Sequence, residues 1–431
     1  MVSILLDIQG PKIRTGLLPE GTREVEEGEL LAFSPDPEKV KDGCIHIAYD
    51  NLLNDIQKGS TIFLDDGLIE VVVERVDTDR AFCRVVTGGL LKGRKGVTLP
   101  GVKVDLPALT ESDIEHIRFG VEQGVDFFAA SFVRKAEHVR AVADIIRQFG
   151  GTQRVVAKIE NAEGIENMDE IIDAADAIMV ARGDMGVELP PEDVPIVQKR
   201  IIKKCNEAGK PVITATQMLD SMVRSPRPTR AEATDVANAI FDGTDAVMLS
   251  GETAVGRYPV RVVEVMDKIA RRAETAMDFP LFLDRARHAS GGSIAEAIAR
   301  ATSELVQDLR VRAILCSTQS GATARLLSKY RPKVPIVALT PYEHVARQLM
   351  LSWGVHPFIV PPLGNIDDII DAAIYVARKN GIIETGDTVA IAAGVRTGVP
   401  GSTNLLQVHI VTEEDGEEPW EDPQQRVGEE S

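Results

Sequence analysis

The feature that most constrains this fold is a regular alternation of apolar strands and amphipathic helices between residues 99 and 280. The strand-like segments read DFFAASF, RVVAKIE, DAIMVARGD, PVITAT and DAVMLSGE, and each precedes a stretch with helical periodicity. Alternation of this kind is typical of βα units, which build a parallel sheet covered by helices. Capping boxes at Thr110-x-x-Asp113 and Thr229-x-x-Glu232 mark two of the expected helix starts. The sequence therefore predicts an α/β fold.

The segments on either side of this block differ from it. Residues 16–98 contain short β-like runs separated by Gly and Asp turns, which indicates a small all-β domain. Near residue 293 a capping box, Ser293-x-x-Glu296, opens a smaller α/β block that ends at Val411. From Thr412 the chain is acidic, with two prolines and a single Trp420, so we expect a disordered tail.

Charge and cysteine usage exclude several classes of function. The chain has 48 basic and 66 acidic residues, a net charge of −18, which disfavours binding to nucleic acid or to an anionic membrane. Its four cysteines lie far apart without a C-x-x-C pair, so they predict neither a disulfide framework nor a zinc ribbon. We expect a cytoplasmic enzyme.

Polar side chains stand at the carboxyl ends of the predicted strands, the edge at which barrels and open parallel sheets bind ligands. They are Ser131, Lys158, Glu160, Asp184, Thr214, Thr216, Ser250 and Glu252. Lys158 and Glu160 are two residues apart on one strand, so both point to the same side, while Ala157 and Ile159 face the helices. Taken alone, Ser131 or Thr214 is better explained as a turn or capping residue.

The group around Lys158 indicates the chemistry. A buried Lys158–Glu160 pair that was only structural would cost several kcal/mol unless fully satisfied, which favours a functional reason for it. Glu160 and Asp184 are hard oxygen ligands of the kind that Mg²⁺ takes, usually one or two per site, with water and substrate phosphate completing its shell. The residues alone therefore predict Mg²⁺-assisted chemistry on an anionic, phosphorylated substrate.

A second candidate site lies in the C-terminal block. The segment STQSGATAR follows the strand RAILC, and its hydroxyls and helix N–H groups could cradle a phosphate. The residues concerned are Ser317, Thr318, Ser320, Gly321 and Thr323. An ordinary hydroxyl-rich helix cap is the alternative.

Several longer segments resemble pyruvate kinase. They read LLDIQGPKIRTG, KGVTLPG, VVAKIENAEGIENMDEII, VARGDMGVELP, ATQMLDSM, RPTRAEATDVANAIFDGTDAVMLSGETAVG and STNLLQV. The resemblance implies a (β/α)8 TIM-type barrel, an inserted small β-barrel lid and a C-terminal α/β open-sheet domain. On that basis we expect the barrel at 1–15 and 99–287, the lid at 16–98, an effector domain at 288–411 and the disordered acidic tail at 412–431.

The resemblance also implies a function and its residues. It implies phosphoryl transfer from phosphoenolpyruvate to ADP, giving pyruvate and ATP in glycolysis. The residues are Glu160 and Asp184 for Mg²⁺ or Mn²⁺; Lys158, Thr216, Ser250 and Glu252 for catalysis; Lys158, Gly183, Asp184 and Thr216 for the substrate; and Arg14 and Lys95 for the nucleotide. It further implies a homotetramer and an effector site for a sugar phosphate or AMP at Thr318, Ser320, Gly321 and Thr323, under a loop at 399–404.

One departure from the family concerns a monovalent cation. Most members read D-T-K-G-P-E where residues 7–12 of this chain read DIQGPK. In this cation region Asp7 is kept, but Ile8 lacks the hydroxyl and Lys12 replaces a carboxylate with an ammonium, so K⁺ is not expected to be required. The alternative is that Lys12 swings into solvent and K⁺ still binds through Asp7.

A second departure is that SILLD looks like the third strand of the family's barrel, so we expect the first two βα units to be lacking. This leaves two other functions open: an inactive fragment or regulatory paralogue that binds a phosphorylated metabolite, and a Mg²⁺-dependent barrel lyase acting on a 2-oxo acid. The intact set of Lys158, Glu160, Asp184 and Thr216 argues against the first. The lid and the ATQMLDSM segment argue against the second.

Overall fold

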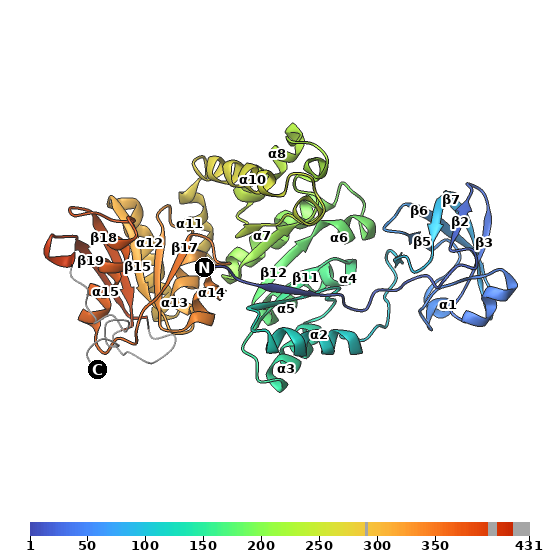
Figure 1. Cartoon of the computed structure of the whole chain (residues 1–431), viewed down its shortest axis with the longest axis horizontal. Helices are drawn as coiled ribbons and strands as arrows, with labels where there is room; N and C mark the ends of the chain where they lie inside the picture. The colour runs from blue at the N-terminus through green and yellow to red at the C-terminus, as the bar shows by residue number, and fades with distance from the viewer. Residues whose placement is uncertain (289–291, 395–402, 417–431) are drawn as a thin grey trace, which may run out of the picture.

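The computed structural model describes residues 1–288, 292–394 and 403–416 of the 431-residue chain. Three parts follow one another along its longest axis (Figure 1): an all-β part, a central α/β part and a C-terminal α/β part. The chain starts in the central part, leaves it for the all-β part, and returns.

The central part is a parallel sheet of six strands in the order β1-β10-β11-β12-β13-β14. The strands are β1 (Leu5–Ile8), β10 (Phe127–Ala130), β11 (Arg154–Ile159), β12 (Ala177–Ala181), β13 (Val212–Ala215) and β14 (Ala246–Val247). The helices are α2 (Glu111–Glu122), α3 (Ala136–Gln148), α4 (Ala162–Glu166), α5 (Met168–Ala174), α6 (Arg182–Glu188), α7 (Val194–Ala208), α8 (Arg230–Asp242), α9 (Gly251–Ala254) and α10 (Pro259–Glu274). The predicted βα alternation is confirmed. The expectation that the first two βα units of the family's barrel are lacking stays a prediction.

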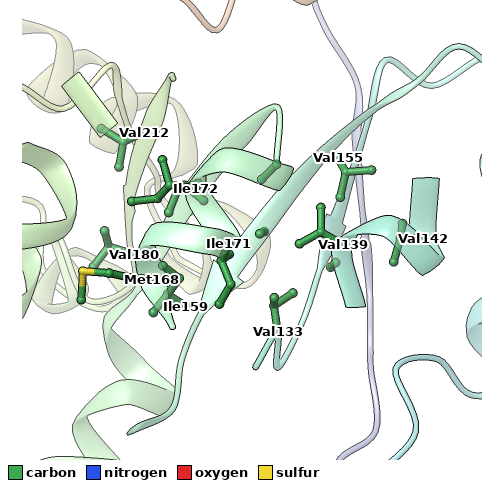
Figure 2. Packing of buried hydrophobic residues seen from close by; sticks show 14 of the residues in the cluster. Val133, Val139, Val142, Val155, Ile159, Met168, Ile171, Ile172, Val180 and Val212 are labelled. Carbon is green, nitrogen blue, oxygen red and sulfur yellow. The ribbon is translucent and has the colours of Figure 1, made fainter. Parts of the chain in front are cut away.

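Alternate residues of each strand pack on opposite faces of this sheet. Val155 and Ile159 of β11 belong to the cluster that meets Val139 of α3 and Ile171 of α5 (Figure 2). Val156, one residue along, belongs to a separate cluster on the inner face. This period of two leaves Lys158 on the inner face, as the sequence predicts.

The all-β part has its own apolar core and two sheets, ordered β4-β3-β7-β6-β5-β9 and β2-β8. Its strands are β2 (Thr22–Val25), β3 (Leu30–Ser34), β4 (Ile45–His46), β5 (Thr61–Leu64), β6 (Ile69–Val76), β7 (Ala81–Thr87), β8 (Gly89–Lys92) and β9 (Val97–Thr98), with the short helix α1 (Leu52–Asp55) and a 3₁₀ turn at Pro37–Asp42. We call this part the lid. A tight turn at Asp65–Gly67 joins β5 to β6, and Asp65 and Asp66 both adopt left-handed backbone angles there.

The C-terminal part is a five-stranded sheet, β17-β16-β15-β18-β19, with an apolar cluster on each face. Its elements are α11 (Phe279–His288), α12 (Ile294–Asp308), β15 (Val311–Ser317), α13 (Ala322–Lys329), β16 (Ile336–Thr340), α14 (Glu343–Leu349), β17 (Val355–Ile359), α15 (Ile366–Lys379), β18 (Thr388–Ala393) and β19 (Leu405–Ile410). The strands are parallel except for β19, which pairs antiparallel with β18.

Buried polar contacts join the central and C-terminal parts. The Arg331 guanidinium lies 2.8 Å from the Asp245 carboxylate, and both side chains are almost completely buried. Arg347 and Asp126 form a second ion pair of 2.8 Å, and Arg154 Nε donates to Gln348 Oε1. These contacts hold the C-terminal part against the amino-terminal ends of β10, β11 and β14.

Two of the three predicted capping boxes are confirmed. Thr110 with Asp113 and Thr229 with Glu232 exchange both hydrogen bonds at the starts of α2 and α8. At α12, Ser293 caps the helix by accepting from the Glu296 N–H, but the reciprocal bond is not formed. The Glu296 carboxylate instead binds the Lys329 ammonium at 2.6 Å, because a charged partner from α13 offers a stronger hydrogen bond than a backbone amide.

The start of the predicted tail differs from expectation. Residues 414–416 form a 3₁₀ turn, and Asp415 accepts hydrogen bonds from the Thr412 N–H and the His409 ring. These contacts tie residues 412–416 to β19. The rest of the predicted tail, with Trp420, lies outside the described residues. Within the described ranges no helix has an apolar stretch long enough to cross a membrane.

Close packing between α2 and the sheet allows a test of the fold. A Cβ at Gly120 would lie 2.6 Å from the fully buried Phe128 ring and 3.1 Å from Leu6 Cδ1. We expect Gly120→Ala to lower the free energy of unfolding by about 1–3 kcal/mol, since overpacking outweighs the gain in helix propensity. The matched control is Gly186→Ala in α6, whose Cβ would meet nothing within 4 Å. Urea unfolding curves of both variants test this, and an unchanged midpoint for Gly120→Ala would contradict it.

Candidate active site

The Lys158 ammonium joins the carboxyl ends of three neighbouring strands. It lies 3.1 Å from an Asp7 carboxylate oxygen at the end of β1, and it donates to Ser131 Oγ, just beyond β10, at 2.8 Å. On its own strand, β11, it lies 3.1 Å from Glu160 Oε1. Although burial opposes it, the carboxylates of Glu160 and Asp7 raise the pKa of Lys158, so the ammonium is charged at neutral pH.

Glu160 is held rigidly but is not fully satisfied. Its residue is 1% exposed, and its Oε2 accepts the Phe132 backbone N–H at 2.7 Å. Its Oε1 is buried, lies 3.1 Å from the Lys158 ammonium, and has no other hydrogen-bond donor among the residues that the structure describes. Burial, with the nearby Asp184 carboxylate, raises the pKa of Glu160, which is the situation that a bound cation would relieve.

These carboxylates fit a Mg²⁺ ion. Glu160 supplies a buried oxygen whose one donor among the described residues is the Lys158 ammonium, and Asp184 supplies a second carboxylate at the start of α6. The described residues contain no cluster of three or more His, Cys, Asp or Glu side chains able to hold a metal. An ion here would therefore complete its shell with water and substrate oxygens, as Mg²⁺ commonly does.

Lys12 lies between the lid and the central sheet, where the sequence alone could not place it. Its Nζ is 3.1 Å from Asp66 in the lid turn and 3.1 Å from Asp184. The interactions found for Asp7 are instead with Lys158 and Ser131. Although burial opposes it, the carboxylates of Asp184 and Asp66 raise the pKa of Lys12, and the side chain does not swing into solvent.

The expectation that Ile8 costs the cation region a ligand is also wrong. Its side chain is 1% exposed and belongs to the apolar cluster between the sheet and its helices. A threonine at this position would direct its side chain toward that cluster rather than toward the strand-end site. The loss of a hydroxyl at residue 8 therefore removes no ligand from the strand-end site.

The Thr216 hydroxyl lies at the next strand end, after β13. It accepts the Gly183 N–H at 2.8 Å, and Thr216 adopts φ +67°, a costly conformation for a β-branched residue. Arg182 holds this turn, because its guanidinium donates to the Thr216 carbonyl and forms an ion pair of 2.7 Å with Asp235. The sequence places Arg182 at a strand end beside Gly183 but indicates no role for it, and no pattern in the sequence indicates Asp235.

The other predicted residues lie apart from Lys158. Glu252 is buried, and both its carboxylate oxygens accept backbone N–H groups, from Leu219 and from Ser250. In the lid, Lys95 pairs with Asp65 at 2.9 Å and Arg14 donates to the Arg94 carbonyl. None of these contacts reaches the strand-end carboxylates of Glu160 and Asp184.

The hydroxyl-rich turn of the C-terminal part opens α13. Gly321 caps this helix with φ +80°, a conformation that favours glycine. Thr323 Oγ1 lies 2.7 Å from Thr403 Oγ1, and both residues are buried. The predicted loop at 399–404 is thus in contact at Thr403, while residues 399–402 lie outside the described residues.

A cavity of about 120 Å³ lies below Lys12, where the chain passes between the central part and the lid. Its lining includes Pro11, Lys12, Phe132, Arg134 and Glu188. Burial, with the Asp184 carboxylate next in effect, raises the pKa of Glu188 from an ordinary 4.5 to about 7. No pattern in the sequence indicates a perturbed carboxyl group at Glu188.

The raised pKa of Glu188 predicts a pH-dependent stability. The folded state holds the Glu188 proton more tightly than the unfolded chain does. The contribution of this group to the free energy of unfolding is therefore fully present below about pH 4.5 and is lost as pH rises to about 7. In EDTA, we expect the free energy of unfolding to fall across this window, relative to Glu188→Gln, by up to about 3 kcal/mol. Urea unfolding at several pH values measures it, with the exposed Glu122→Gln as control. Parallel curves for the wild type and Glu188→Gln would contradict the prediction.

Known proteins share this sequence and architecture. A family profile described as pyruvate kinase, barrel domain, matches residues 1–263, and one described as pyruvate kinase, alpha/beta domain, matches residues 296–409. The chain is 49% identical over 420 residues to a pyruvate kinase of Geobacillus stearothermophilus, a match covering 96% of this chain and 71% of that protein. A pyruvate kinase of Clostridium acetobutylicum is 47% identical over 412 residues, 95% of this chain and 87% of that protein. The crystal structure of a pyruvate kinase from Cryptosporidium parvum superposes with a TM-score of 0.90 at 39% identity, over 95% of this chain and 84% of that one.

Proposed function

The chain belongs to the pyruvate kinase family, and we propose that its strand-end site transfers the phosphoryl group of phosphoenolpyruvate to ADP. The products are ATP and pyruvate. The observation that carries this proposal is the Lys158 ammonium, which lies between Asp7, Ser131 and Glu160 on the inner face of the sheet.

Phosphoryl transfer needs positioning and positive charge more than covalent chemistry. Lys158 supplies a fixed ammonium whose charge is secured by its carboxylate neighbours, and it stabilises the charge that develops on the transferring group and on the enolate. Glu160 and Asp184 would hold the Mg²⁺ or Mn²⁺, which supplies further positive charge when bound. The Glu160 Oε1 atom, buried and without a donor other than the Lys158 ammonium among the described residues, supports this role.

The substrate is proposed to bind at Gly183, Asp184 and Thr216. The Gly183 N–H and the Thr216 hydroxyl lie 2.8 Å apart, at a turn that Arg182 holds in a strained conformation. Both donors are engaged in this structure, because the Thr216 hydroxyl donates in turn to the Ala215 carbonyl, so a bound substrate carboxylate would replace these contacts. Ser250 and Glu252 are proposed for proton relay, although both Glu252 oxygens already accept backbone N–H groups, which favours a positioning role for Glu252.

The lid is proposed to close over the nucleotide. Arg14 and Lys95 lie in and beside it and would contact the nucleotide phosphates. In that arrangement residues 1–15 and 99–287 form the barrel domain, 16–98 the lid, 288–411 the effector domain and 412–431 the tail. The Lys12–Asp66 contact, between the lid turn and the start of the chain, supports closure onto the strand ends.

The remaining proposals concern regulation and assembly. The turn at Thr318, Ser320, Gly321 and Thr323 is proposed to bind a phosphorylated effector such as a sugar phosphate or AMP, supported by its position at the start of an eight-residue helix. A homotetramer in the cytoplasm follows from the family alone.

Two substitutions test the site assignment. We expect Lys158→Met and Glu160→Gln each to lower kcat/KM by at least ~10²-fold, about 3 kcal/mol of transition-state stabilisation. Lys203→Met, on the exposed side of α7, should keep wild-type turnover. A coupled assay of pyruvate formation with saturating Mg²⁺ measures the effect. Near-parental turnover in either site variant would remove that residue from the proposed machinery.

Lys12 predicts independence from K⁺. An ammonium a few ångströms from a K⁺ ion would repel it by about 4 kcal/mol at an effective dielectric of about 20, and the charge of Lys12 is fixed here by Asp184 and Asp66. In tetramethylammonium buffer we expect less than about a tenfold rise in rate on adding ~100 mM KCl, an amount that keeps ionic screening near physiological. Lys12→Glu should acquire K⁺ dependence, and fully so, because the Ile8 side chain faces the core. A strong K⁺ activation of the wild type would contradict the prediction.

A further inference from the structure

A second group of charged residues lies far from Lys158, between the barrel domain and the C-terminal domain. It lines a cavity of about 10 Å³ beside the contact of α7 with α13. The charged or unpartnered lining residues are Lys210, Asp245, Arg325, Lys329, Arg331 and Ser352. Lys210 and Asp245 come from the barrel domain, and the other four come from the C-terminal domain.

Arg331 is the central group of this cavity. Its side chain is 3% exposed, and its backbone takes φ +49°, in the left-handed region. One guanidinium nitrogen, Nη2, donates to Asn206 Oδ1, the Gly243 carbonyl and Asp245 Oδ2. The other two nitrogens, Nε and Nη1, are buried and have no hydrogen-bond partner among the residues described.

Unsatisfied donors of this kind are expensive. A buried polar group without a partner costs about 1–3 kcal/mol, and more when it is charged. The Ser352 hydroxyl, in the same lining, is also buried and unpartnered within the described ranges. The cavity therefore presents N–H and O–H donors that need an acceptor.

The charged residues that line the cavity are mostly cations. Four of its lining residues are cations and one, Asp245, is an anion. Both oxygens of the Asp245 carboxylate already have hydrogen-bond partners, because the carboxylate binds Arg331 and accepts the backbone N–H groups of Val212 and Trp353. Lys329 is paired with Glu296, whereas Arg325 donates to a carbonyl, that of Ser320. Burial, with Arg154 next in effect, lowers the pKa of Arg325 to about 10, as expected in a region of positive potential.

We propose that this interdomain cavity binds a small monovalent anion of chloride size, held by Arg331 Nε and Nη1 and by the Ser352 hydroxyl. Size limits the ligand to a single small particle, since a cavity of this volume holds about one water molecule, and chloride, which is somewhat larger, would widen it slightly. Charge distinguishes an anion from water: a water molecule accepts two hydrogen bonds and must also place its own two hydrogens on acceptors, whereas an anion accepts from all three donors and needs no acceptor.

The cavity also has a route to solvent. A groove of about 530 Å³ on the surface shares Gly209, Arg325 and Lys329 with the cavity lining. The groove is lined by two cations, Arg325 and Lys329, and by two carboxylates, Glu207 and Glu296, of which Glu296 is paired with Lys329. Because its ligands come from the C-terminal domain while the surrounding charges come from both domains, the bound ion strengthens the interface between them.

Bromide is a suitable probe, since it resembles chloride in size and can be located by anomalous scattering. In bromide-soaked crystals we expect an anomalous peak within hydrogen-bond distance of Arg331 Nε and Nη1. In solution, Trp353 reports on the site because its ring lies 5.4 Å from the Arg331 guanidinium. The chain has two tryptophans, so Trp420→Phe leaves Trp353 as the single indole.

We expect bromide to quench Trp353 with a saturable component that chloride reverses and gluconate does not, at constant ionic strength. Chloride should also raise the thermal midpoint saturably. Arg331→Lys keeps a cation beside Asp245 but removes the two unpartnered nitrogens, and it should weaken bromide at least ~10-fold, the value of one charge-assisted hydrogen bond. Arg312→Lys, at an exposed position of β15, is the matched control.

Linear quenching alone, together with no anomalous peak at Arg331, would show that the cavity holds water and would overturn the proposal. Equal bromide affinity in Arg331→Lys and in the wild type would also overturn the assignment. If Arg331→Lys fails to fold, the anomalous map and the chloride competition on the wild-type chain still decide the question.

Discussion

The charge of Lys158 is the interaction on which the site depends. Three strands of the parallel sheet end in groups that could not lie together without it, because the carboxylates of Asp7 and Glu160 would repel each other across a partly buried interior. The ammonium neutralises both carboxylates, and the buried Oε1 of Glu160 has no donor besides it among the described residues. The same contacts that hold the strand ends therefore also prepare a place for a metal and an anionic substrate.

The two outer domains are attached to this sheet by contacts of very different strength. The lid meets it through Lys12 and Asp66, and the Asp66 side chain is 71% exposed, so solvent and salt weaken this pair. The C-terminal domain is attached through Arg331 and Asp245, which are almost fully buried, and breaking such a pair costs several kcal/mol. This difference leaves the lid able to move during a catalytic cycle while the C-terminal domain stays in place.

The sequence predicted features that depend on local pattern. The period of two on β11 placed Lys158 and Glu160 on the inner face, and the capping boxes at Thr110 and Thr229 followed from spacing alone. Contacts between distant segments were not predictable in this way. Lys12 reaches Asp184 only because the chain folds back around the lid, and Glu296 leaves its capping role because Lys329 arrives from another helix. Arg331 and Asp245 are 86 residues apart, and no periodicity relates them.

One strand connects the domain interface with the site. Asp245 accepts the Val212 N–H at the start of β13, and the Thr216 hydroxyl follows the other end of this four-residue strand. A strand paired on both sides moves as a unit, so the position of Asp245, and hence of Arg331, helps to set where Thr216 lies. Asp245 is held in turn by Trp353 and Arg331, both from the C-terminal domain. The strained turn at Thr216 is thus supported from both ends: by Arg182 beside it, and by the buried ion pair at the beginning of its strand.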